Sequence, residues 1–385
     1  MKILHLCLGN FYIDNYSYQE NMLPKFHKKM GLDVEIIASL LSYDEDGNHC
    51  YLDKSGSYIN EYGIPVTRLK FKKNIFNKRL RRFQGFYEAL SKSKPDIIFI
   101  HNCQFLDIKE VVKYVKLNPD VKIYVDNHAD FSNSARNILS RTILHKIFWR
   151  KCAQQIEPYT TKFYGVLPAR IDFLKKLYKL PAERIELLLM GADDDKVQET
   201  KDPHVRKEIR EKHNIKEDDF LIVTGGKIDK FKKQTLLLME AVKEIDDDKV
   251  KLIVFGSVIN ELKESIRELS DGEKIQYIGW LDSDDCYKYF AAADLGVFPG
   301  RHSVLWEQAV GTGLPCIFKY LEGTTHVDVG GSCIFLYNDS KEEIKEKIEL
   351  LIIDKELYKK MKSITGEEGM KKFSYYQIAK ESIGL

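Results

Sequence analysis

The sequence predicts two doubly wound α/β domains, and three observations lead to this fold class. Short apolar runs alternate with helical periodicity along all 385 residues, which is typical of parallel sheets covered by helices. These runs fall into two series, separated by a polar and highly charged stretch around 192–206. Hydrophobic residues make up 44% and charged residues 31% of the chain, a balance that suits a globular protein and excludes general disorder.

The expected strands of the two series follow one another along the chain. The first series comprises the apolar runs 2–8, 34–38, 97–100, 122–125, 163–167 and 185–189. The second comprises 220–224, 250–255, 275–278, 295–298, 316–319 and 333–336, with helical patterns at 234–245, 258–270 and 341–363. We therefore expect a first domain over 1–195, a linker around 192–206 and a second domain over 205–370. Because open parallel sheets bind ligands beyond the carboxyl ends of their strands, a cleft between the two halves is expected.

Composition and motifs exclude several classes of function. The net charge of +2 gives no global signal for nucleic-acid binding, and the seven scattered cysteines contain no Cys-x-x-Cys pair that would indicate zinc or a disulfide framework. The N-terminus becomes polar too quickly for a signal peptide, and no apolar stretch approaches the ~20 residues that span a bilayer, so a cytoplasmic location is expected. Aspartate triplets at 193–195 and 246–248 fall in the predicted linker and a turn. We therefore expect no metal and no cofactor.

The stretch 294–316 is the most informative part of the chain. An apolar run stops at Pro299, a compact loop follows, a helix is predicted to open near Glu307, and a second strand-like run begins after Pro315. Amide groups at a helix N-terminus attract phosphate, and a carboxylate in the first turn can accept hydrogen bonds from sugar hydroxyls. This arrangement suits a nucleotide-sugar. The alternative is one more βαβ unit, in which Glu307 is only a first-turn charge favoured by the helix dipole.

Three other strand ends carry candidate ligand-binding residues. Gly9 follows the first strand, where a glycine lets backbone amides approach a ligand, although a simple turn would explain it as well. His128 and Asp130 follow the fourth strand, where an imidazole suits hydrogen bonding or proton transfer, although a single histidine is more often structural. His101 ends the third strand in the same way and is a weaker candidate.

The first strand of the second series ends in a glycine pair and a basic loop. Lys227 and Lys232 follow Gly225 and Gly226 in this loop. Two fixed cations would stabilise the charge that develops on a diphosphate leaving group. The alternative is a solvated basic loop without a ligand.

Three separated segments of the chain resemble, in the right order, the glycogen-synthase-like retaining glycosyltransferases, family 4 of the GT-B fold. The Glu-Gln-Ala at 307–309 and the Gly-Leu-Pro at 313–315 match the second half of that family's donor-site pattern, and the loop 226–232 matches its Gly-Arg-Leu-x-x-x-Lys with Lys227 in place of arginine. The first half departs from the pattern, because Pro299 stands where the family has its first glutamate. The resemblance covers nearly the whole chain. It implies a GT-B fold, and transfer of a sugar from a nucleotide-diphosphate donor to a hydroxyl.

The resemblance also implies roles for individual residues. The loop of Gly9 would face the donor diphosphate and the acceptor, His128 would contact the transferred sugar, and Asp130 would orient His128 or bind the acceptor. In the second domain the candidates are Lys227 and Lys232 for the diphosphate, the main-chain amides of Ser303 and Val304 for phosphate, Glu307 for the ribose, and His302 for the sugar in place of the missing glutamate. The segment 371–385 would return to the first domain as a terminal helix.

A basic stretch at 68–82 contains eight cations and no acid, with apolar residues interleaved. Such a stretch suits docking on an anionic membrane surface, with Arg79, Arg81 and Arg82 among the membrane-facing residues and a second basic-aromatic segment at 141–151 on the same face. A lipid-linked or cell-surface glycan acceptor on the inner face of the cell membrane would follow. A solvated charged face is the alternative, and nucleic acid is not expected because no recognition motif accompanies the charge.

Two other functions remain open from the sequence. The chain could be a non-catalytic partner subunit of GT-B architecture, since the first glutamate is missing. It could also be a sugar-nucleotide epimerase of the same architecture, which would favour paired acids and histidines in the cleft and would have no need of a membrane face.

Overall fold

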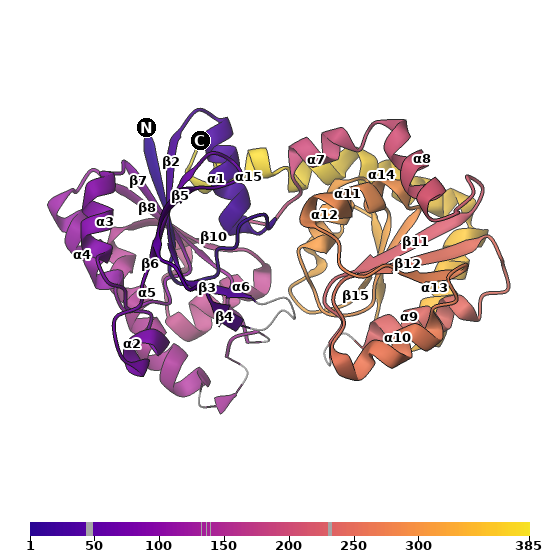
Figure 1. Ribbon diagram of the computed structural model, residues 1–385, viewed down its shortest axis with the longest axis horizontal. Helices are drawn as coiled ribbons and strands as arrows, with labels where there is room; N and C mark the ends of the chain where they lie inside the picture. The colour runs from indigo at the N-terminus through magenta and orange to yellow at the C-terminus, as the bar shows by residue number, and fades with distance from the viewer. Residues whose placement is uncertain (44–48, 132, 136, 139, 230–232) are drawn as a thin grey trace. The chain divides into compact units, whose positions relative to one another are not determined.

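The computed structural model describes residues 1–43, 49–131, 133–135, 137–138, 140–229 and 233–385. Lys232, one of the two cations predicted to bind the diphosphate, therefore lies outside the described residues. The chain forms two compact units. The first consists of Met1–Leu189 with Tyr376–Leu385, and the second of Met190–Tyr375 (Figure 1).

The first unit is built around an eight-stranded sheet with the order β10-β9-β8-β7-β1-β2-β6-β5. Its strands are β1 (Lys2–Cys7), β2 (Asp33–Ser39), β5 (Gly56–Ile59), β6 (Pro65–Leu69), β7 (Ile97–His101), β8 (Lys122–Asn127), β9 (Thr160–Gly165) and β10 (Ile185–Leu187). All neighbours pair in parallel except the edge strand β5, which runs antiparallel to β6. Each apolar run predicted for this half overlaps one of these strands. A separate hairpin pairs β3 (Leu41–Tyr43) with β4 (His49–Tyr51).

The helices of the first unit cover both faces of this sheet. They are α1 (Gln19–Lys29), α2 (Ile75–Arg79), α3 (Phe86–Ser93), α4 (Ile108–Leu117), η1 (Ser140–Trp149), α5 (Arg150–Ile156), η2 (Glu157–Tyr159), α6 (Pro168–Phe173), η3 (Leu174–Tyr178), η4 (Ala182–Arg184) and α15 (Tyr375–Ser382). Leu4 and Leu6 of β1 belong to one core with residues of α3, α4 and α5. The intervening His5 points to the other face and contacts His27 of α1, because side chains alternate along a strand.

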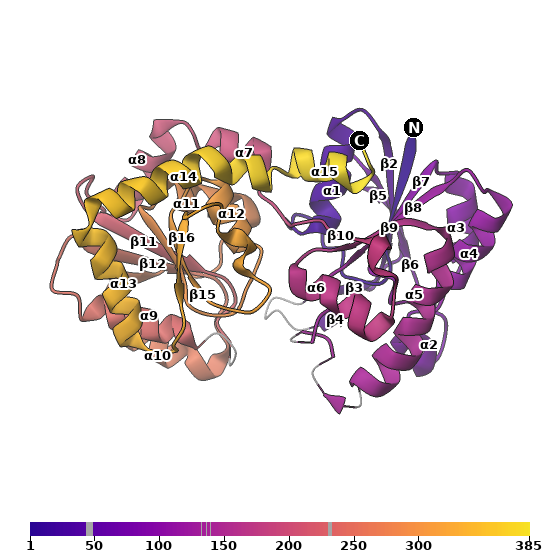
Figure 2. The same ribbon diagram turned by 180° about the vertical axis from the view of Figure 1, so that it is seen from behind.

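The second unit contains a six-stranded, fully parallel sheet with the order β13-β12-β11-β14-β15-β16. Its strands are β11 (Phe220–Gly225), β12 (Val250–Phe255), β13 (Ile275–Tyr277), β14 (Leu295–Phe298), β15 (Cys316–Lys319) and β16 (Cys333–Leu336). Its helices are α7 (Asp194–Glu199), α8 (Pro203–Lys212), α9 (Gln234–Lys243), η5 (Asn260–Leu262), α10 (Lys263–Leu269), α11 (Ser283–Ala292), α12 (Leu305–Gly311), η6 (Thr325–Val327), α13 (Lys341–Ile353) and α14 (Lys355–Phe373) (Figure 2). All six strands coincide with predicted apolar runs.

The polar stretch 192–206, predicted to be a linker, is instead helical and belongs to the second unit. Asp193 caps α7 by accepting a hydrogen bond from the Asp195 amide, and Asp202 caps α8 by accepting one from the His204 amide. Proline at the first position of α8 is also typical of a helix start. Charged residues mistaken for a linker therefore begin two surface helices. Among the described residues, no helix is both long and apolar enough to cross a membrane.

Candidate active site

The candidate residues of the first unit lie where β1, β7 and β8 end. These strands are neighbours in the parallel sheet, so their carboxyl ends share one edge. Gly9 and Asn102 approach each other so closely that a Cβ atom on Gly9 would lie 1.9 Å from the Asn102 carbonyl oxygen. Glycine at position 9 is thus required by the packing of two loops, which is a different reason from the predicted approach of a ligand.

His128 sits at this edge between two carboxylates. Its Nε2 atom lies 3.3 Å from Asp126 Oδ2 and 3.8 Å from Glu20 Oε1, and its backbone amide donates to Asn102 Oδ1 over 3.0 Å. Burial disfavours the imidazolium, but the charges of Glu20 and Asp126 outweigh it and raise the pKa of His128 above its ordinary value. The two anions therefore favour the protonated form of the His128 imidazole at this edge.

Asp130 was predicted to orient His128 or to bind the acceptor, but the structure places the carboxylates of Asp126 and Glu20 beside the His128 imidazole. The Asp130 carboxylate pairs with Arg170 Nε at 3.3 Å and accepts the Asn133 amide at 2.9 Å. Asp126 precedes His128 by two residues, and its Oδ2 faces both His128 and His101, with His101 Nδ1 at 2.7 Å. Although burial alone would raise it, the pKa of Asp126 lies below its usual range because of these two histidines. Binding of the acceptor by Asp130 stays a prediction.

Two buried polar residues at the start of α1 were not predicted from the sequence. Glu20 is 2% exposed, and its Oε1 accepts a hydrogen bond from Asn10 Nδ2. Gln19 is 1% exposed, and among the described residues neither atom of its side-chain amide has a hydrogen-bond partner. A buried amide without a partner is costly, so a polar ligand at this edge would relieve it. An acid in the first turn of a helix was the only signal for Glu20 in the sequence.

In the second unit, the loop predicted to bind phosphate follows β11 and is anchored by its backbone. Gly226 has a φ of +113°, which favours glycine, and its amide donates to the Phe255 carbonyl over 3.1 Å. The Ile228 amide donates to the Ser257 carbonyl over 2.8 Å, so the loop is tied to the end of β12. Lys227 lies between these two anchored residues and is half-buried. Its contact with a diphosphate stays a prediction.

Glu307 is fully buried in the first turn of α12 and is held by two histidines. Its Oε1 accepts hydrogen bonds from His302 Nε2 at 2.9 Å and from His326 Nε2 at 2.7 Å. Burial alone would raise its pKa, but the two histidines lower the pKa of Glu307 to about 2. His302 was predicted to contact the sugar; its imidazole contacts Glu307 here, and the sugar contact stays a prediction. His326 lies 19 residues beyond Glu307 and was missed, because no local pattern connects the two.

Two buried polar atoms at the start of α12, one before its N-cap and one in its first turn, lack partners in the described part of the chain. Among the described residues, Glu307 Oε2 and Ser303 Oγ form no hydrogen bond. Val304 is the residue at the N-cap, and Trp306 anchors the turn by stacking on Phe318 with ring centroids 4.5 Å apart. A fixed carboxylate oxygen, a hydroxyl and helix-start amides can together bind hydroxyl groups and phosphate.

Two groups of side chains in the described part of the chain have the composition of metal sites. One contains Glu20, His101 and His128, and the other contains His302, Glu307 and His326, with ligand atoms within 4.8 Å of one another in each. In the second group His326 Nε2 lies 2.7 Å from Glu307 Oε1. In the first, His128 Nε2 lies 3.8 Å from Glu20 Oε1, and His101 Nδ1 lies 2.7 Å from Asp126, which is outside the group. A separation of 2.7 Å is typical of a charge-assisted hydrogen bond, so His101 and His326 are each held by a carboxylate. The absence of a metal stays a prediction.

Two of the three arginines predicted to face a membrane are used within the protein instead. The Arg81 guanidinium donates to the carbonyls of Gly9 and Gln104, and burial lowers its pKa to about 10. Arg82 Nε donates to the fully buried carboxylate of Asp107 over 3.2 Å. Both guanidinium groups therefore donate hydrogen bonds to oxygen atoms inside the protein rather than facing a membrane. Arg79 remains exposed in α2.

The chain is similar to known proteins in the sequence of its second unit and in its fold. Residues 205–367 match the family model described as glycosyl transferases group 1. The fold is GT-B. HepE of Anabaena, solved in complex with UDP, has a TM-score of 0.70 and 14% identity, with 100% of this chain and 99% of that chain covered. WaaG, a glycosyltransferase involved in lipopolysaccharide biosynthesis, has a TM-score of 0.68 and 14% identity, with 98% of each chain covered.

A third GT-B structure has a different activity in its description. A putative UDP-N-acetylglucosamine 2-epimerase from Listeria monocytogenes has a TM-score of 0.64 and 14% identity, with 99% of this chain and 94% of that chain covered. No curated protein matches the chain. The similarity to group 1 glycosyl transferases thus lies within the second unit, and the reaction of the whole chain has to be argued from its sites.

Proposed function

We propose that the protein is a retaining glycosyltransferase that moves a sugar from a nucleotide-diphosphate donor to a hydroxyl of a glycan or lipid-linked acceptor. The observation that carries this proposal is the pair of buried, unpartnered atoms at the start of α12, Glu307 Oε2 and Ser303 Oγ, within the described residues. An ionised carboxylate that is buried with one free oxygen is suited to a ribose hydroxyl. The match of 205–367 to group 1 glycosyl transferases and the neighbour solved with UDP support the same donor class.

In this proposal each candidate residue has a distinct task. Glu307 accepts hydrogen bonds from the ribose, and Ser303 and Val304 bind phosphate through their amides. Lys227 supplies positive charge to the diphosphate as it leaves. His128 contacts the transferred sugar, and the charges of Glu20 and Asp126 raise the pKa of its imidazole. No metal or cofactor has a task in this mechanism. As in the family that the chain resembles, an oxygen of the leaving phosphate would accept the proton of the acceptor hydroxyl.

Titration with nucleoside diphosphates tests the donor assignment. A bound nucleotide stabilises the folded state by mass action, so UDP or another nucleoside diphosphate should raise the melting temperature of the wild type. Ser303→Ala and Glu307→Gln should weaken this shift, whereas Glu322→Gln, the same chemical change at an exposed position, should not. A wild type stabilised by no nucleoside diphosphate would refute the proposal. Binding without transfer or donor hydrolysis would instead indicate a non-catalytic partner subunit.

An epimerase remains the second candidate because of the cluster around His128. Two carboxylates and an imidazole meet there, with Asp126 Oδ2 at 3.3 Å and Glu20 Oε1 at 3.8 Å from His128 Nε2, and one structural neighbour is described as a putative epimerase. Incubating the protein with UDP-N-acetylglucosamine and following the sugar by NMR distinguishes the two reactions. An epimerase yields the 2-epimer without an acceptor, whereas a transferase leaves the configuration at C2 unchanged.

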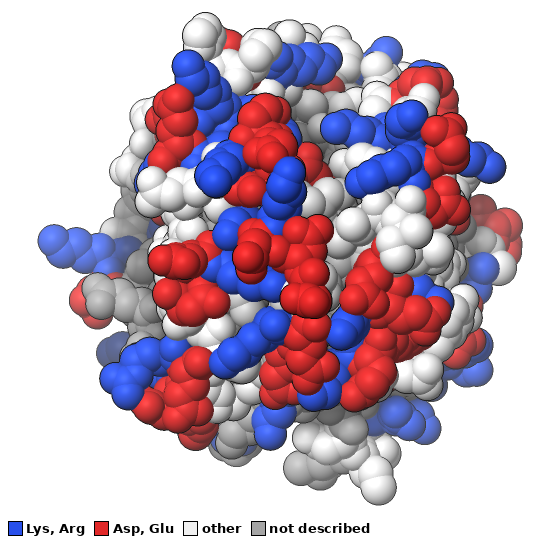
Figure 3. Space-filling model, turned by 90° about the vertical axis from the view of Figure 1, so that its right-hand side faces the viewer, with Lys and Arg blue, Asp and Glu red and all other residues white. Residues whose placement is uncertain are grey.

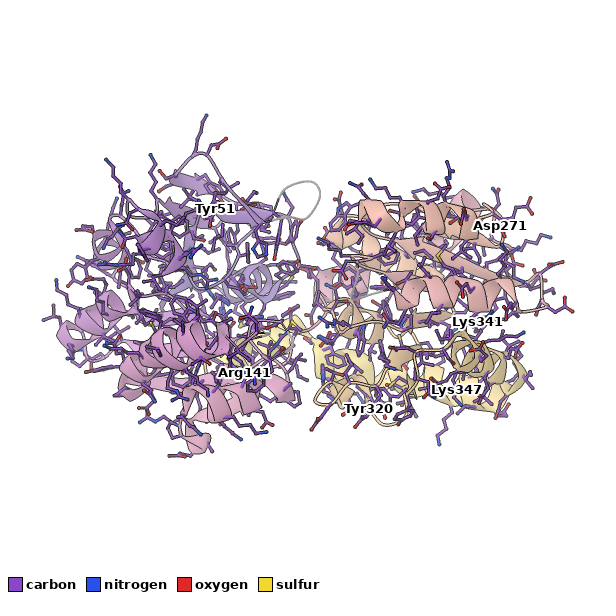
Figure 4. The ribbon with its side chains drawn as sticks, turned by 90° about the horizontal axis from the view of Figure 1, so that it is seen from below. Tyr51, Arg141, Asp271, Tyr320, Lys341 and Lys347 are labelled. Carbon is purple, nitrogen blue, oxygen red and sulfur yellow. The ribbon has the colours of Figure 1, made fainter. Side chains whose placement is uncertain are left out.

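We also propose that the first unit docks on an anionic membrane surface through α2. Ile75 and Phe76 are 63% and 72% exposed there, and Lys73 and Arg79 flank them as exposed cations. Exposed apolar side chains beside cations are typical of a surface that inserts among anionic headgroups. The same unit contains Arg141, from the second basic segment, and Tyr51 (Figure 4). Lys78 Nζ lies over the Tyr51 ring, 3.3 Å from its centroid.

One face of the second unit has a different charge pattern. Lysines and arginines are interspersed with aspartates and glutamates over this face (Figure 3). Within the second unit, Lys341 pairs with Glu244, and Lys347 pairs with Glu346 at 2.7 Å. Mixed charges of this kind have little net attraction for an anionic surface, which favours the first unit as the docking side.

A further inference from the structure

Three buried imidazoles form a hydrogen-bonded chain beneath His128. His27 of α1, His5 of β1 and His101 of β7 are each 0% exposed. His27 Nδ1 lies 3.0 Å from His5 Nε2, and His5 Nδ1 lies 3.0 Å from His101 Nε2. The rings are stacked, with centroids 5.2 Å apart for His5 and His27 and 5.3 Å apart for His5 and His101. Both ring nitrogens of every member are engaged, so the chain is continuous.

Each end of this chain meets a hydrogen-bond acceptor. At one end, His27 Nε2 lies 2.9 Å from the carbonyl oxygen of Ala379 in α15, and a carbonyl can only accept. At the other end, His101 Nδ1 lies 2.7 Å from the carboxylate oxygen Oδ2 of Asp126. Ser382 Oγ is 3.1 Å from His27 Nε2, but its hydroxyl donates to the Ala379 carbonyl over 2.8 Å. It therefore has no second proton for His27.

Counting protons shows that the chain carries an excess charge. Four hydrogen bonds connect the three rings and the two terminal acceptors. Each bond needs one proton, and neither terminal acceptor supplies one. Three neutral imidazoles carry only three ring protons, because a neutral ring has one donor nitrogen and one acceptor nitrogen. One of the three rings is therefore an imidazolium.

The surroundings of the rings place this charge on His101. Burial, together with the neighbouring histidines, lowers the pKa of His5 well below its ordinary value, and burial lowers the pKa of His27 to about 4. His101 alone contacts an anion, and its 2.7 Å separation from Asp126 is that of a charge-assisted hydrogen bond. The other titratable groups around this end are Glu20, His128, Cys7 and Cys103.

We propose that His101 is a permanently buried imidazolium. His5 and His27 are positioning residues: His5 accepts the hydrogen bond of His101, His27 accepts that of His5, and the Ala379 carbonyl accepts that of His27. His101 holds Asp126 as an ionised acceptor whose Oδ2 also faces His128 at 3.3 Å, so the chain controls the charge of His128. The terminal acceptor lies in α15, which comes directly after the second unit in sequence. The position of the C-terminal segment is thereby coupled to the charge of His128 at the candidate active site. Only the catalytic importance of His128 rests on the proposed function.

The wild-type protein tests the proton count directly. Selective ¹⁵N labelling of histidine reports by NMR which ring nitrogens are protonated, and single substitutions assign the signals. At pH 8 the proposal expects His101 with both nitrogens protonated, and His5 and His27 protonated at Nε2 only. Three singly protonated rings at pH 8 would overturn the proposal. This measurement needs neither a substrate nor an active enzyme, so it decides the proposal even if the proposed function fails.

A substitution within the chain tests the coupling to His128. His5→Phe removes the acceptor for His101 Nε2, so His101 should become neutral and the pKa of His128 should rise by about 1 unit or more. A shift of this size follows from removing a unit charge that shares one carboxylate oxygen with His128. The control is His145→Phe, a buried histidine of the same unit whose ring contacts Tyr178 instead. It should leave the pKa of His128 unchanged.

The same variants separate positioning from simple loss of structure. If the protein transfers sugar, the pH profile of kcat should shift upward in His5→Phe by the same amount as the pKa of His128, and it should not move in His145→Phe. An unchanged pKa of His128 in a folded His5→Phe protein would refute the coupling. Should His5→Phe fail to fold, the measurement on the wild type still confirms or overturns the buried charge.

Discussion

Replacing Glu307 by glutamine removes one buried charge and leaves the shape of the site nearly unchanged. The carboxylate is fully buried, and His302 and His326 hold its pKa at about 2 against an ordinary value of 4.5. A depression of roughly 2.5 units corresponds to about 3 kcal/mol of stability from the ionised form. Because the folded-state pKa is lowered, this stability is complete above pH 4.5 and disappears as the pH falls from 4.5 towards 2. Glu307→Gln should therefore destabilise the second unit by about 3 kcal/mol at pH 7.

The assay has to report on the second unit alone, since a chain of two units need not unfold in one step. The protein has three tryptophans. Of these, Trp306 is buried beside the site, Trp149 lies in the first unit, and Trp280 is 57% exposed. Urea unfolding followed by fluorescence in a Trp149→Phe, Trp280→Phe background therefore measures the unit that contains Glu307.

Glu322→Gln is the matched control, because it makes the same chemical change at an exposed position, where surface substitutions usually stay within about 0.5 kcal/mol. Glu307→Gln should also weaken UDP binding by about 10-fold or more, since an amide nitrogen cannot accept a hydrogen bond from the ribose. Loss of stability without loss of UDP affinity would refute the ribose contact. Equal stability of Glu307→Gln and the control would refute the buried ion-pair argument itself.

Three further predictions follow from the charged residues. Lys227→Ala should slow transfer by at least ~10²-fold if Lys227 stabilises the leaving diphosphate, and unchanged steady-state kinetics would exclude that role. A Lys73→Glu, Arg79→Glu double variant should no longer float with anionic vesicles in a salt-sensitive way, but it should keep its activity on a soluble acceptor. If the variant floats as well as the wild type, the membrane proposal is wrong. The first unit should lose stability as the pH falls from 6.5 to 4, because burial lowers the pKa of both His27 and His145 to about 4 and the unfolded chain binds these protons first. Each histidine accounts for a loss of up to about 3 kcal/mol in the free energy of unfolding over this pH range. His145→Phe should therefore flatten the pH dependence of urea unfolding. An unaltered pH dependence would contradict this explanation.

Much of the fold could be predicted from the sequence, because parallel strands are buried on both faces and appear as continuous apolar runs. All six strands of the second unit coincide with such runs, and each run predicted in the first unit overlaps a strand. The predicted linker was wrong, since the polar residues of 192–206 begin helices with aspartate caps. The strands β5 and β6 were missed; β5 carries mostly exposed residues, which produce no apolar run.

The candidate site also has a part that could be predicted from the sequence and a part that depends on tertiary contacts. The position of Glu307 at a helix start could be predicted, because residues 303–307 lie close together in the sequence and their spacing is visible locally. Only the tertiary structure decided what surrounds His128 and Glu307. Asp126, rather than Asp130, faces His128 because side chains alternate along β8 and the register beside β7 brings His101 to the same oxygen. His326 and the chain from His101 through His5 and His27 to Ala379 join residues up to 352 positions apart. Contacts of that kind depend on strand order, register and the return of the C-terminal helix, and no local pattern of amino acids records them.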